Sequence, residues 1–177
     1  MTDEESKMKV LNYISRTVKQ EWIQHLCTDQ SSVSSRLYYI ASLFSFTVTV
    51  LSGAVNQAEV LVLHADEGSS FVKRMPIGIF PLEPKRTQAF IRQLETYDVW
   101  NLADCDANMK DGLLCYHVIA NAERDFCIKM SSPECASDVA YREIVNLYSK
   151  EFLNGMINLV YSPPPPWVDI LSKLSHK

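Results

Sequence analysis

Glycine is scarce in this sequence, which holds five glycines among 177 residues. None of them lies in a GxGxxG pattern or a phosphate-binding loop, the motifs that use glycine to bring the backbone close to phosphate groups. A GxSxG nucleophile elbow and an HExxH zinc helix are also missing. The sequence therefore argues against a dinucleotide-binding enzyme and a phosphate-loop nucleotidase. It also argues against a hydrolase with a GxSxG elbow and a protease with an HExxH zinc helix.

Clustered basic residues are missing as well. The net charge is −4, and the densest basic group is Lys85 and Arg86 with Arg92 nearby, a spacing that a solvated helix face explains. Because nucleic-acid binding depends on clustered Lys and Arg that neutralise phosphates, we expect no nucleic-acid partner. A mildly acidic surface is better suited to a basic protein partner.

The cysteines form no CxxC pair, and their number is odd. In a chain of this length, such spacing favours free thiols in a reducing cytoplasm over a disulfide framework. The first five residues also lack the cationic start and apolar core of a secretory signal, so we expect a cytoplasmic protein. The cysteines are Cys27, Cys105, Cys115, Cys127 and Cys135.

A stretch without charged side chains runs from Leu37 to Ala58 and is long enough to span a bilayer. However, it contains several Ser and Thr residues, and from Phe44 to Val50 these alternate with apolar residues. That period is typical of a strand rather than of a lipid-facing helix. We therefore expect buried strands here and no membrane partner.

Apolar residues recur at helical spacing in three segments, 3–27, 84–96 and 138–159. Strand-like runs bounded by turn residues occupy the chain between them. Prolines and a glycine between Pro76 and Pro84 are expected to interrupt regular structure. The expected strands are 36–41, 42–52, 59–65, a short edge strand at 71–75, and two strands within 113–130.

This order of segments predicts one α+β domain over residues 1–177. In it, a mostly antiparallel sheet of about five or six strands packs against two or three helices. The helix within residues 1–30 and the helix at 138–159 are expected to cover one face. Residues 163–177 form a proline-rich tail, in which Pro163–Pro166 either straps the C-terminus across the domain, as we favour, or serves as a ligand for a proline-reading module.

The segment 113–130 predicts a hairpin with its turn centred on Ala122. A continuous apolar face supports this register, since a slip of one residue would destroy that face. The reverse face then places His117 directly across from Cys127, beside Cys115. The apolar pairs in this register are Leu114 with Met130, Tyr116 with Ile128, and Val118 with Phe126.

Thiol and imidazole groups on neighbouring strands raise two alternatives. Cys115, His117 and Cys127, with Cys135 as a fourth donor, would suit zinc, although their spacing matches no established zinc signature. Cys115 and His117 would also suit a thiol nucleophile and its base, but no third orienting group can be named. We favour the interpretation that they are semi-buried structural residues, and we expect no metal and no cofactor.

Three carboxylates, Asp104, Asp106 and Asp111, lie close together around an expected loop. Carboxylate oxygens bind divalent cations, but these lack the spacing of an EF-hand, and we favour a role in forming turns. Loops on a rigid scaffold are common contact sites. We therefore predict Asp104, Asp106 and Asp111 as partner-binding residues.

The order of features over residues 34–150 resembles a group of small bacterial cytoplasmic proteins, some of them similar to immunity proteins. The chain departs from the group's pattern after Gly112, where an aromatic residue is often expected and Leu113, Leu114 and Cys115 follow. The resemblance implies a protein without enzymatic activity that neutralises an antibacterial toxin. The matching residues are Arg36, Leu37, Tyr38, Phe46 to Val50, Phe90, Leu94, Trp100, Leu102, Asp111, Gly112, Ser132 and Pro133.

The absence of catalytic motifs and the mild acidity predict a non-enzymatic protein-binding protein. The resemblance implies, more specifically, a cytosolic immunity protein that neutralises an antibacterial toxin. The alternative is an enzyme of unrecognised type that uses Cys115 and His117. The expected partner is another protein, with a cognate toxin as the specific case. A second copy of the chain, forming a homodimer, is a further expected partner.

Overall fold

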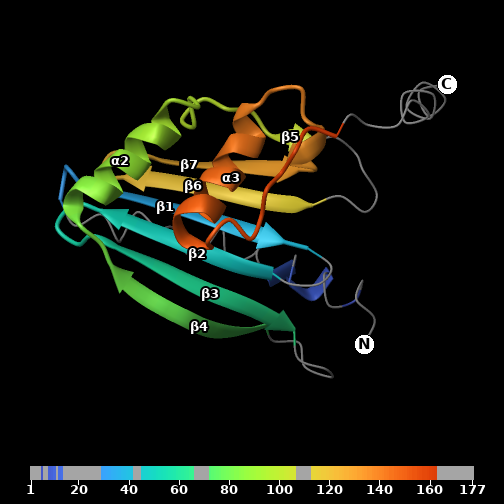
Figure 1. Cartoon of the computed structure of the whole chain (residues 1–177), viewed down its shortest axis with the longest axis horizontal. Coiled ribbons are helices and arrows are strands. Elements are labelled where there is room, and N and C mark those ends of the chain that lie inside the picture. Colours follow the sequence, from blue (N-terminus) through green and yellow to red (C-terminus); the bar gives the residue numbers. More distant parts are fainter. Residues whose placement is uncertain are drawn as a thin grey trace.

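The computed structural model describes residues 5, 8–10, 12–13, 29–41, 45–65, 72–106 and 113–162, and Figure 1 shows their arrangement. The predicted α+β class with a mostly antiparallel sheet is confirmed, although the sheet has seven strands, slightly more than expected. The strands are β1 (Val33–Ile40), β2 (Ser45–Ser52), β3 (Gln57–Ala65), β4 (Val72–Pro81), β5 (Cys105–Asp106), β6 (Leu114–Asn121) and β7 (Asp125–Ser131). The helices are α2 (Pro84–Glu95), the 3-10 turn η2 (Pro133–Cys135) and α3 (Ala140–Phe152).

The strands follow the order β4-β3-β2-β1-β6-β7-β5 across the sheet. Strand β1 therefore lies in the middle and is antiparallel to both β2 and β6. The short strand β5 runs parallel to β7. The charge-free stretch forms β2 and parts of β1 and β3, as its alternation predicts, and no helix among the described residues is long and apolar enough to cross a membrane.

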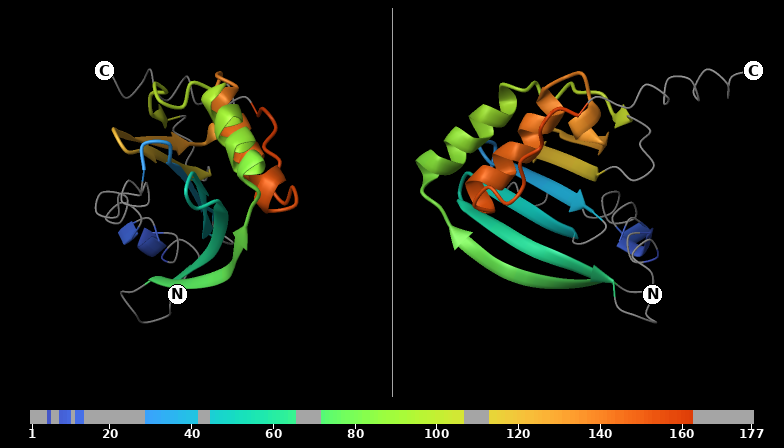
Figure 2. Two further views of the ribbon diagram at one scale, coloured as in Figure 1. Left: turned by 90° about the vertical axis from the view of Figure 1, so that its left-hand side faces the viewer. Right: turned by 45° about the vertical axis from the view of Figure 1, so that its right-hand side comes forward.

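The two faces of the sheet are covered by different parts of the chain. Helices α2 and α3 lie on one face, and the described N-terminal residues lie on the other (Figure 2). Alternate side chains of β1 explain this, because Leu37 packs in the core beneath the helices while Tyr38 packs in a second core with Val10. The expectation that the N-terminal helix and the last helix share a face is therefore wrong. Most of segment 3–27 lies outside the described residues. The part of it that the structure describes, residues 5, 8–10 and 12–13, is helical.

Helix α2 confirms the predicted helix at 84–96, but α3 is shorter than predicted. It ends at Phe152, and the chain then turns through Asn154 and Gly155, both in the left-handed region with φ of 51° and 69°. Such a turn ends a helix because it redirects the backbone, and glycine takes it without strain. Residues 156–162 run back beside α3, and the predicted tail at 163–177 lies outside the described residues.

Strand β4 is longer than the predicted edge strand at 71–75. It continues through Pro76 to Pro81, and its pairing with β3 shifts by one residue between Val60 and Leu61, which leaves Ile77 as the extra residue of a bulge. Proline fits an edge strand because its missing N–H can face away from the neighbouring strand. The prediction that Pro76 interrupts regular structure is therefore wrong at this edge.

The predicted hairpin forms, but its register differs by one residue from the prediction. The Asn121 side chain accepts hydrogen bonds from the backbone N–H groups of Glu123 and Arg124, both at 2.9 Å, and so places the centre of the turn after Ala122. Local side-chain bonds of this kind set turn geometry. The observed pairs include Leu114 with Ser131, Tyr116 with Lys129, His117 with Ile128, and Val118 with Cys127.

Candidate functional site

The core beneath the helices contains a chain of three hydrogen-bonded polar side chains. Ser35 of β1 lies between His117 of β6 and Tyr148 of α3, with its Oγ 2.9 Å from His117 Nε2 and 2.6 Å from the Tyr148 hydroxyl. The sheet positions two of them, because β1 and β6 are neighbours and both side chains point toward α3. All three side chains are fully buried. We call this group the polar triad.

Burial controls the protonation of the polar triad. It lowers the pKa of His117 from 6.5 to about 3, because the charged imidazolium would lose its hydration. It also raises the pKa of Tyr148 well above its ordinary value, so the phenol stays protonated. Among the described residues, none hydrogen-bonds to His117 Nδ1. The triad is therefore a neutral network within the core.

A serine that is hydrogen-bonded to a histidine suggests nucleophilic catalysis, but the surroundings of Ser35 and His117 differ from those of an active site. A catalytic pair needs a substrate at the nucleophile and a group that orients the base. Ser35 has no exposed surface, and the described residues provide no partner for the second ring nitrogen of His117. The triad is suited to holding α3 on the sheet.

The cysteines do not join His117 in one site. Cys115 shares the helix-side face with His117, but Cys127 packs in the second core on the opposite face. The prediction that His117 lies across from Cys127 is therefore wrong. Burial raises the pKa of the Cys115 thiol well above its ordinary value and that of Cys127 to about 11, so both are poor nucleophiles. Among the described residues, no group of three or more His, Cys, Asp or Glu side chains is placed to hold a metal ion.

Two of the three predicted partner-binding carboxylates, Asp104 and Asp106, lie at the β5 edge of the sheet. Asp104 and Asp106 are both exposed, and Asp104 Oδ1 accepts a hydrogen bond of 2.8 Å from the backbone N–H of Lys129 in β7. Asp104 therefore also serves as a structural acceptor along an edge where β7 would otherwise be open. Asp111 lies outside the described residues.

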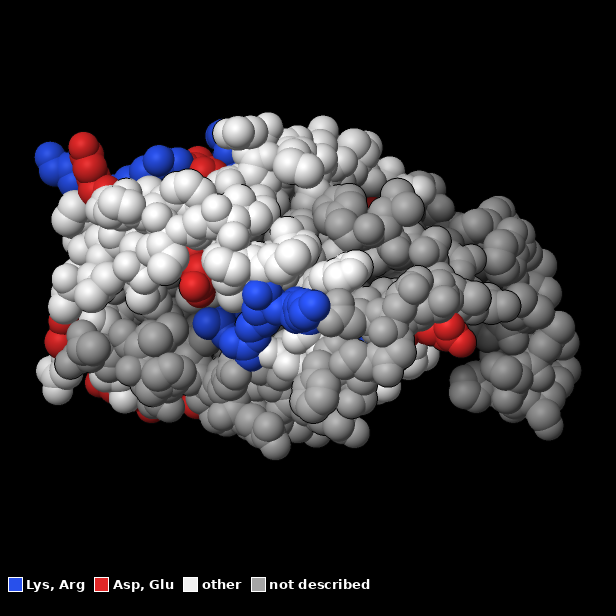
Figure 3. Space-filling model, turned by 90° about the horizontal axis from the view of Figure 1, so that it is seen from below, with Lys and Arg blue, Asp and Glu red and all other residues white. Residues whose placement is uncertain are grey.

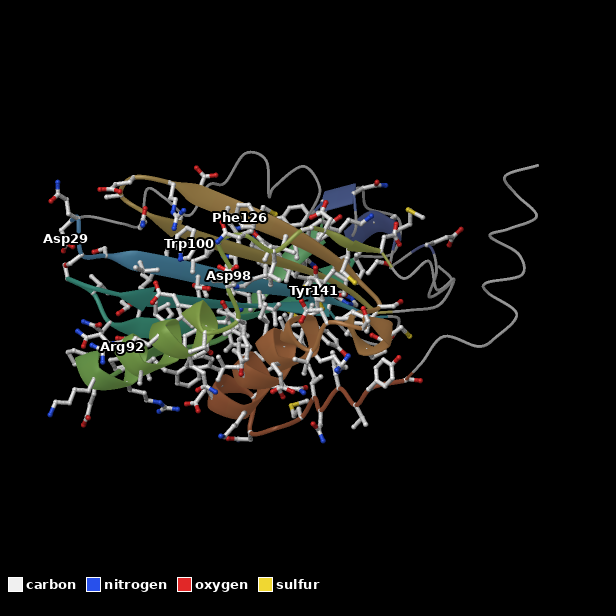
Figure 4. The ribbon with its side chains drawn as sticks, turned by 90° about the horizontal axis from the view of Figure 1, so that it is seen from above. Asp29, Arg92, Asp98, Trp100, Phe126 and Tyr141 are labelled. Carbon is white, nitrogen blue, oxygen red and sulfur yellow. The ribbon has the colours of Figure 1, made fainter. Side chains whose placement is uncertain are left out.

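Aromatic residues hold the chain segment beside this edge. The Tyr141 hydroxyl donates a hydrogen bond of 3.0 Å to the carbonyl of Ala103, and the guanidinium of Arg124 lies 4.2 Å from the centre of the Trp100 ring. Figure 4 looks onto this side of the molecule and shows Trp100, Phe126 and Tyr141 spread along it. These contacts tie the segment before β5 to α3 and to the turn between β6 and β7.

The opposite edge of the sheet, β4, exposes apolar side chains over most of its length. The exposed fractions are 47% for Met75, 62% for Ile77, 58% for Ile79 and 45% for Phe80. Seen from below, the described part of this side is mainly uncharged, with a basic cluster near its middle and an acidic residue beside that cluster (Figure 3). Lys73 and Arg74, at the start of β4, are exposed basic residues. The sequence pattern does not predict this surface, because the turn residues from Pro76 onward favour a strand that ends at residue 75, whereas β4 continues to Pro81.

A shallow cleft lies between α2, α3 and the segment that follows α3, with a volume of about 440 Å³. Its described lining is largely polar and includes no Cys, Ser or His, while Tyr97, Glu143 and Lys150 are its ionisable residues. One lining amide is already engaged, because Asn146 binds the backbone N–H and carbonyl of Leu159 at 2.7 and 3.0 Å. The cleft therefore offers polar and ionisable side chains of α2 and α3 for contacts with a ligand.

Comparisons with protein-family models, with curated proteins and with solved structures give no match to this chain. The resemblance to immunity-like bacterial proteins therefore stays a prediction, and function has to be argued from the chain's own surfaces.

Proposed function

We propose that this chain is a protein-binding protein without catalytic activity of its own, and that β4 is its docking edge. The observation that carries the proposal is the exposure of Met75, Ile77, Ile79 and Phe80 together on one edge strand. Contiguous exposed apolar surface is uncommon on a monomer and marks interaction sites. Strand β4 is also the last strand of the sheet on this side among the described residues, and edge strands are common docking sites.

The buried position of the polar triad supports the absence of catalysis. Its serine and histidine have no exposed surface, and the thiol of Cys115 beside it is fully buried as well. A substrate would have to displace α3 to reach any of them. The alternative of an enzyme based on Cys115 and His117 therefore has less support than a binding protein.

We further propose that the chain acts as a cytosolic immunity protein that neutralises an antibacterial toxin. The net charge of −4 and the exposed carboxylates of Asp104 and Asp106 suit a basic toxin surface. In this proposal Asp104 and Asp106 steer the toxin toward the β5 edge, where Asp104 is already held by β7.

Tagged protein purified from the native lysate tests the binding function. We expect wild type to retain a partner in fixed stoichiometry, and Ile77→Asp to lose it, because a buried carboxylate at an apolar interface is costly. Val160→Asp is the matched control, since Val160 is 69% exposed but lies outside β4. Retention of the same partner by Ile77→Asp would contradict the role of β4.

The toxin and enzyme alternatives need separate measurements. Reversing charge with Asp104→Lys and Asp106→Lys should slow association with a basic toxin and reduce its salt dependence, while β4 binding remains. Cys115→Ala should leave binding unchanged. A catalytic activity of the wild type that Cys115→Ala abolishes would overturn the proposal.

A further inference from the structure

We propose that the cleft between α2, α3 and the segment after α3 binds a short peptide with free termini, about three residues long in an extended conformation. This site goes beyond the proposed docking edge, because none of its lining residues belongs to β4. Two opposite charges on α3, amides on the other two segments and a wall fixed by hydrogen bonds carry the inference.

Two side chains of opposite charge line the cleft from one face of α3. Glu143 and Lys150 are separated by about two helical turns, which brings them to the same side of the helix. Their separation along the helix axis is about 10 Å, because each residue of a helix rises by about 1.5 Å. Asn146 and Leu147 lie between them on this face and also line the cleft. The cleft therefore presents a carboxylate at one end of this face and an ammonium group at the other.

The separation of these charges selects a ligand with two charged ends. A free peptide carries an ammonium group at its N-terminus and a carboxylate at its C-terminus. An extended chain spans about 3.3–3.6 Å per residue, so about three residues reach from Glu143 to Lys150. In this arrangement the N-terminus of the peptide lies at Glu143 and its C-terminus at Lys150. A single amino acid is shorter than this distance, and one terminus of a larger protein would meet only one of the two charges.

Side-chain amides provide hydrogen bonds for the peptide groups between the two termini. Gln93 of α2 and Asn158 of the segment after α3 both line the cleft and are exposed. Each amide has a carbonyl acceptor and two N–H donors, so it can bind a peptide N–H and a peptide carbonyl together. The hydroxyl of Tyr97 adds a further donor and acceptor. These groups favour a peptide over an aliphatic chain that carries the same charges at its ends.

Hydrogen bonds to α3 hold the wall of the cleft that contains Gly155, Ile157 and Asn158. Ser149 Oγ accepts a bond of 2.8 Å from the N–H of Ile157, and the N–H of Gly155 donates to the Ser149 carbonyl at 2.9 Å. A Cβ added at Gly155 would meet nothing within 4 Å, so the backbone there borders open space. A wall that is held in advance reduces the entropy lost on binding. The volume of the cleft, about 440 Å³, is also typical of sites for small ligands.

The charges of Glu143 and Lys150 have a second role within α3. Glu143 lies in the first turn of the helix and Lys150 in its last turn. A carboxylate near the N-terminus and an ammonium group near the C-terminus stabilise a helix because they offset its dipole. That role does not depend on the charges at the ends of a peptide. Binding measurements with altered peptide termini therefore separate the two roles.

Titration of the full chain with trialanine, followed by amide chemical shifts, tests the inference. The cleft is shallow, so we expect a dissociation constant on the order of 0.1–1 mM. Acetylating the N-terminus of the peptide or amidating its C-terminus should raise this constant about three- to fivefold, because each removes one exposed ion pair. Dialanine, which is shorter, and an unbranched ω-amino acid of the same length, which has no amides, should both bind more weakly than trialanine.

Matched variants link each terminus of the peptide to one side chain. Glu143→Gln should weaken trialanine binding as much as N-acetylation does, and it should not weaken binding of the acetylated peptide further, because both changes remove the same contact. Lys150→Gln should show the same relation with the amidated peptide. Lys85→Gln is the control, since Lys85 is an exposed lysine of α2 that does not line the cleft, and it should bind like wild type. Thermal unfolding checks that each variant is folded.

The chemical shifts also locate the ligand, and we expect the largest changes at the N–H groups of Gly155 and Asn158. No change with trialanine at about 10 mM would overturn the inference. Additive losses from Glu143→Gln and N-acetylation would overturn it as well, and so would equal binding of the ω-amino acid, because the amides would then contribute nothing. None of these outcomes bears on β4, whose docking function is tested separately by Ile77→Asp.

Discussion

The Tyr148 hydroxyl lies 2.6 Å from Ser35 Oγ, and this hydrogen bond ties α3 to the middle strand of the sheet. The two residues are separated by 113 positions in the sequence. Because Ser35 also contacts His117, the bond extends the connection to β6. The polar triad therefore links three elements at the centre of the fold.

Replacing Tyr148 by Phe should lower the free energy of unfolding by about 1 kcal/mol, the usual cost of one buried hydrogen bond. The ring would keep its edge contact with Phe90, whose centre lies 5.0 Å away, so packing should be preserved. Urea unfolding of Tyr148→Phe beside Tyr161→Phe, a half-exposed control, measures the difference. Equal stability of the two variants would show that the hydroxyl contributes nothing.

The buried His117 predicts a loss of stability in acid. Its pKa is about 3 in the folded chain and 6.5 in its ordinary state, so between these values the unfolded chain binds a proton that the folded chain does not. The free energy of unfolding should therefore fall by about 1.4 kcal/mol per pH unit as the pH drops below 6.5, levelling off near 3. Urea unfolding at several pH values measures this slope. In His117→Leu it should shrink by that amount, and an unchanged slope would assign the acid sensitivity to other groups.

The side chain of Asn146 holds the segment that follows α3. Its amide binds both backbone groups of Leu159, so Asn146→Ala should loosen the chain around Leu159 and accelerate amide exchange there, while Ile157 stays bound to Ser149. The loss of two partly buried bonds should cost about 1–2 kcal/mol. Asn158→Ala serves as the control, since Asn158 is exposed in the same segment. Equal exchange at Leu159 in both variants would contradict this role.

The side chain of Asn121 stabilises the turn of the β6–β7 hairpin. Its side chain accepts two backbone N–H groups in the turn, so Asn121→Ala should destabilise the protein by about 1 kcal/mol. Glu123→Ala is the neighbouring control, because Glu123 contributes its backbone rather than its side chain to these bonds. Thermal unfolding compares the two, and a larger loss for the control would assign the turn to another residue.

The sequence predicts those elements whose signal is periodic and local. Helix α2 follows from its apolar spacing and from Pro84 at its start, and β2 follows from the alternation between Phe46 and Val50. The prediction fails where one residue decides a boundary. Asn121 sets the hairpin register, Gly155 helps to end α3, and the edge position of β4 admits Pro76.

The polar triad could not be predicted because its members are far apart in the chain. The predicted register places Cys127 across from His117, but a shift of one residue in the observed register turns Cys127 to the other face. Nothing in the local pattern around Ser35 or Tyr148 marks them as neighbours of His117. Their meeting depends on strand order and helix placement, which are set by the whole core.

The central position of β1 has a consequence for the order of folding during synthesis. Strands β1 to β4 leave the ribosome first and can pair in sequence, but the other side of β1 waits for β6, whose Tyr116 pairs with Tyr38. Until then the growing chain presents a half-sheet with the edges of β1 and β4 both bare. Nascent protein is therefore most exposed to premature self-association after β4 has left the ribosome and before β6 has done so.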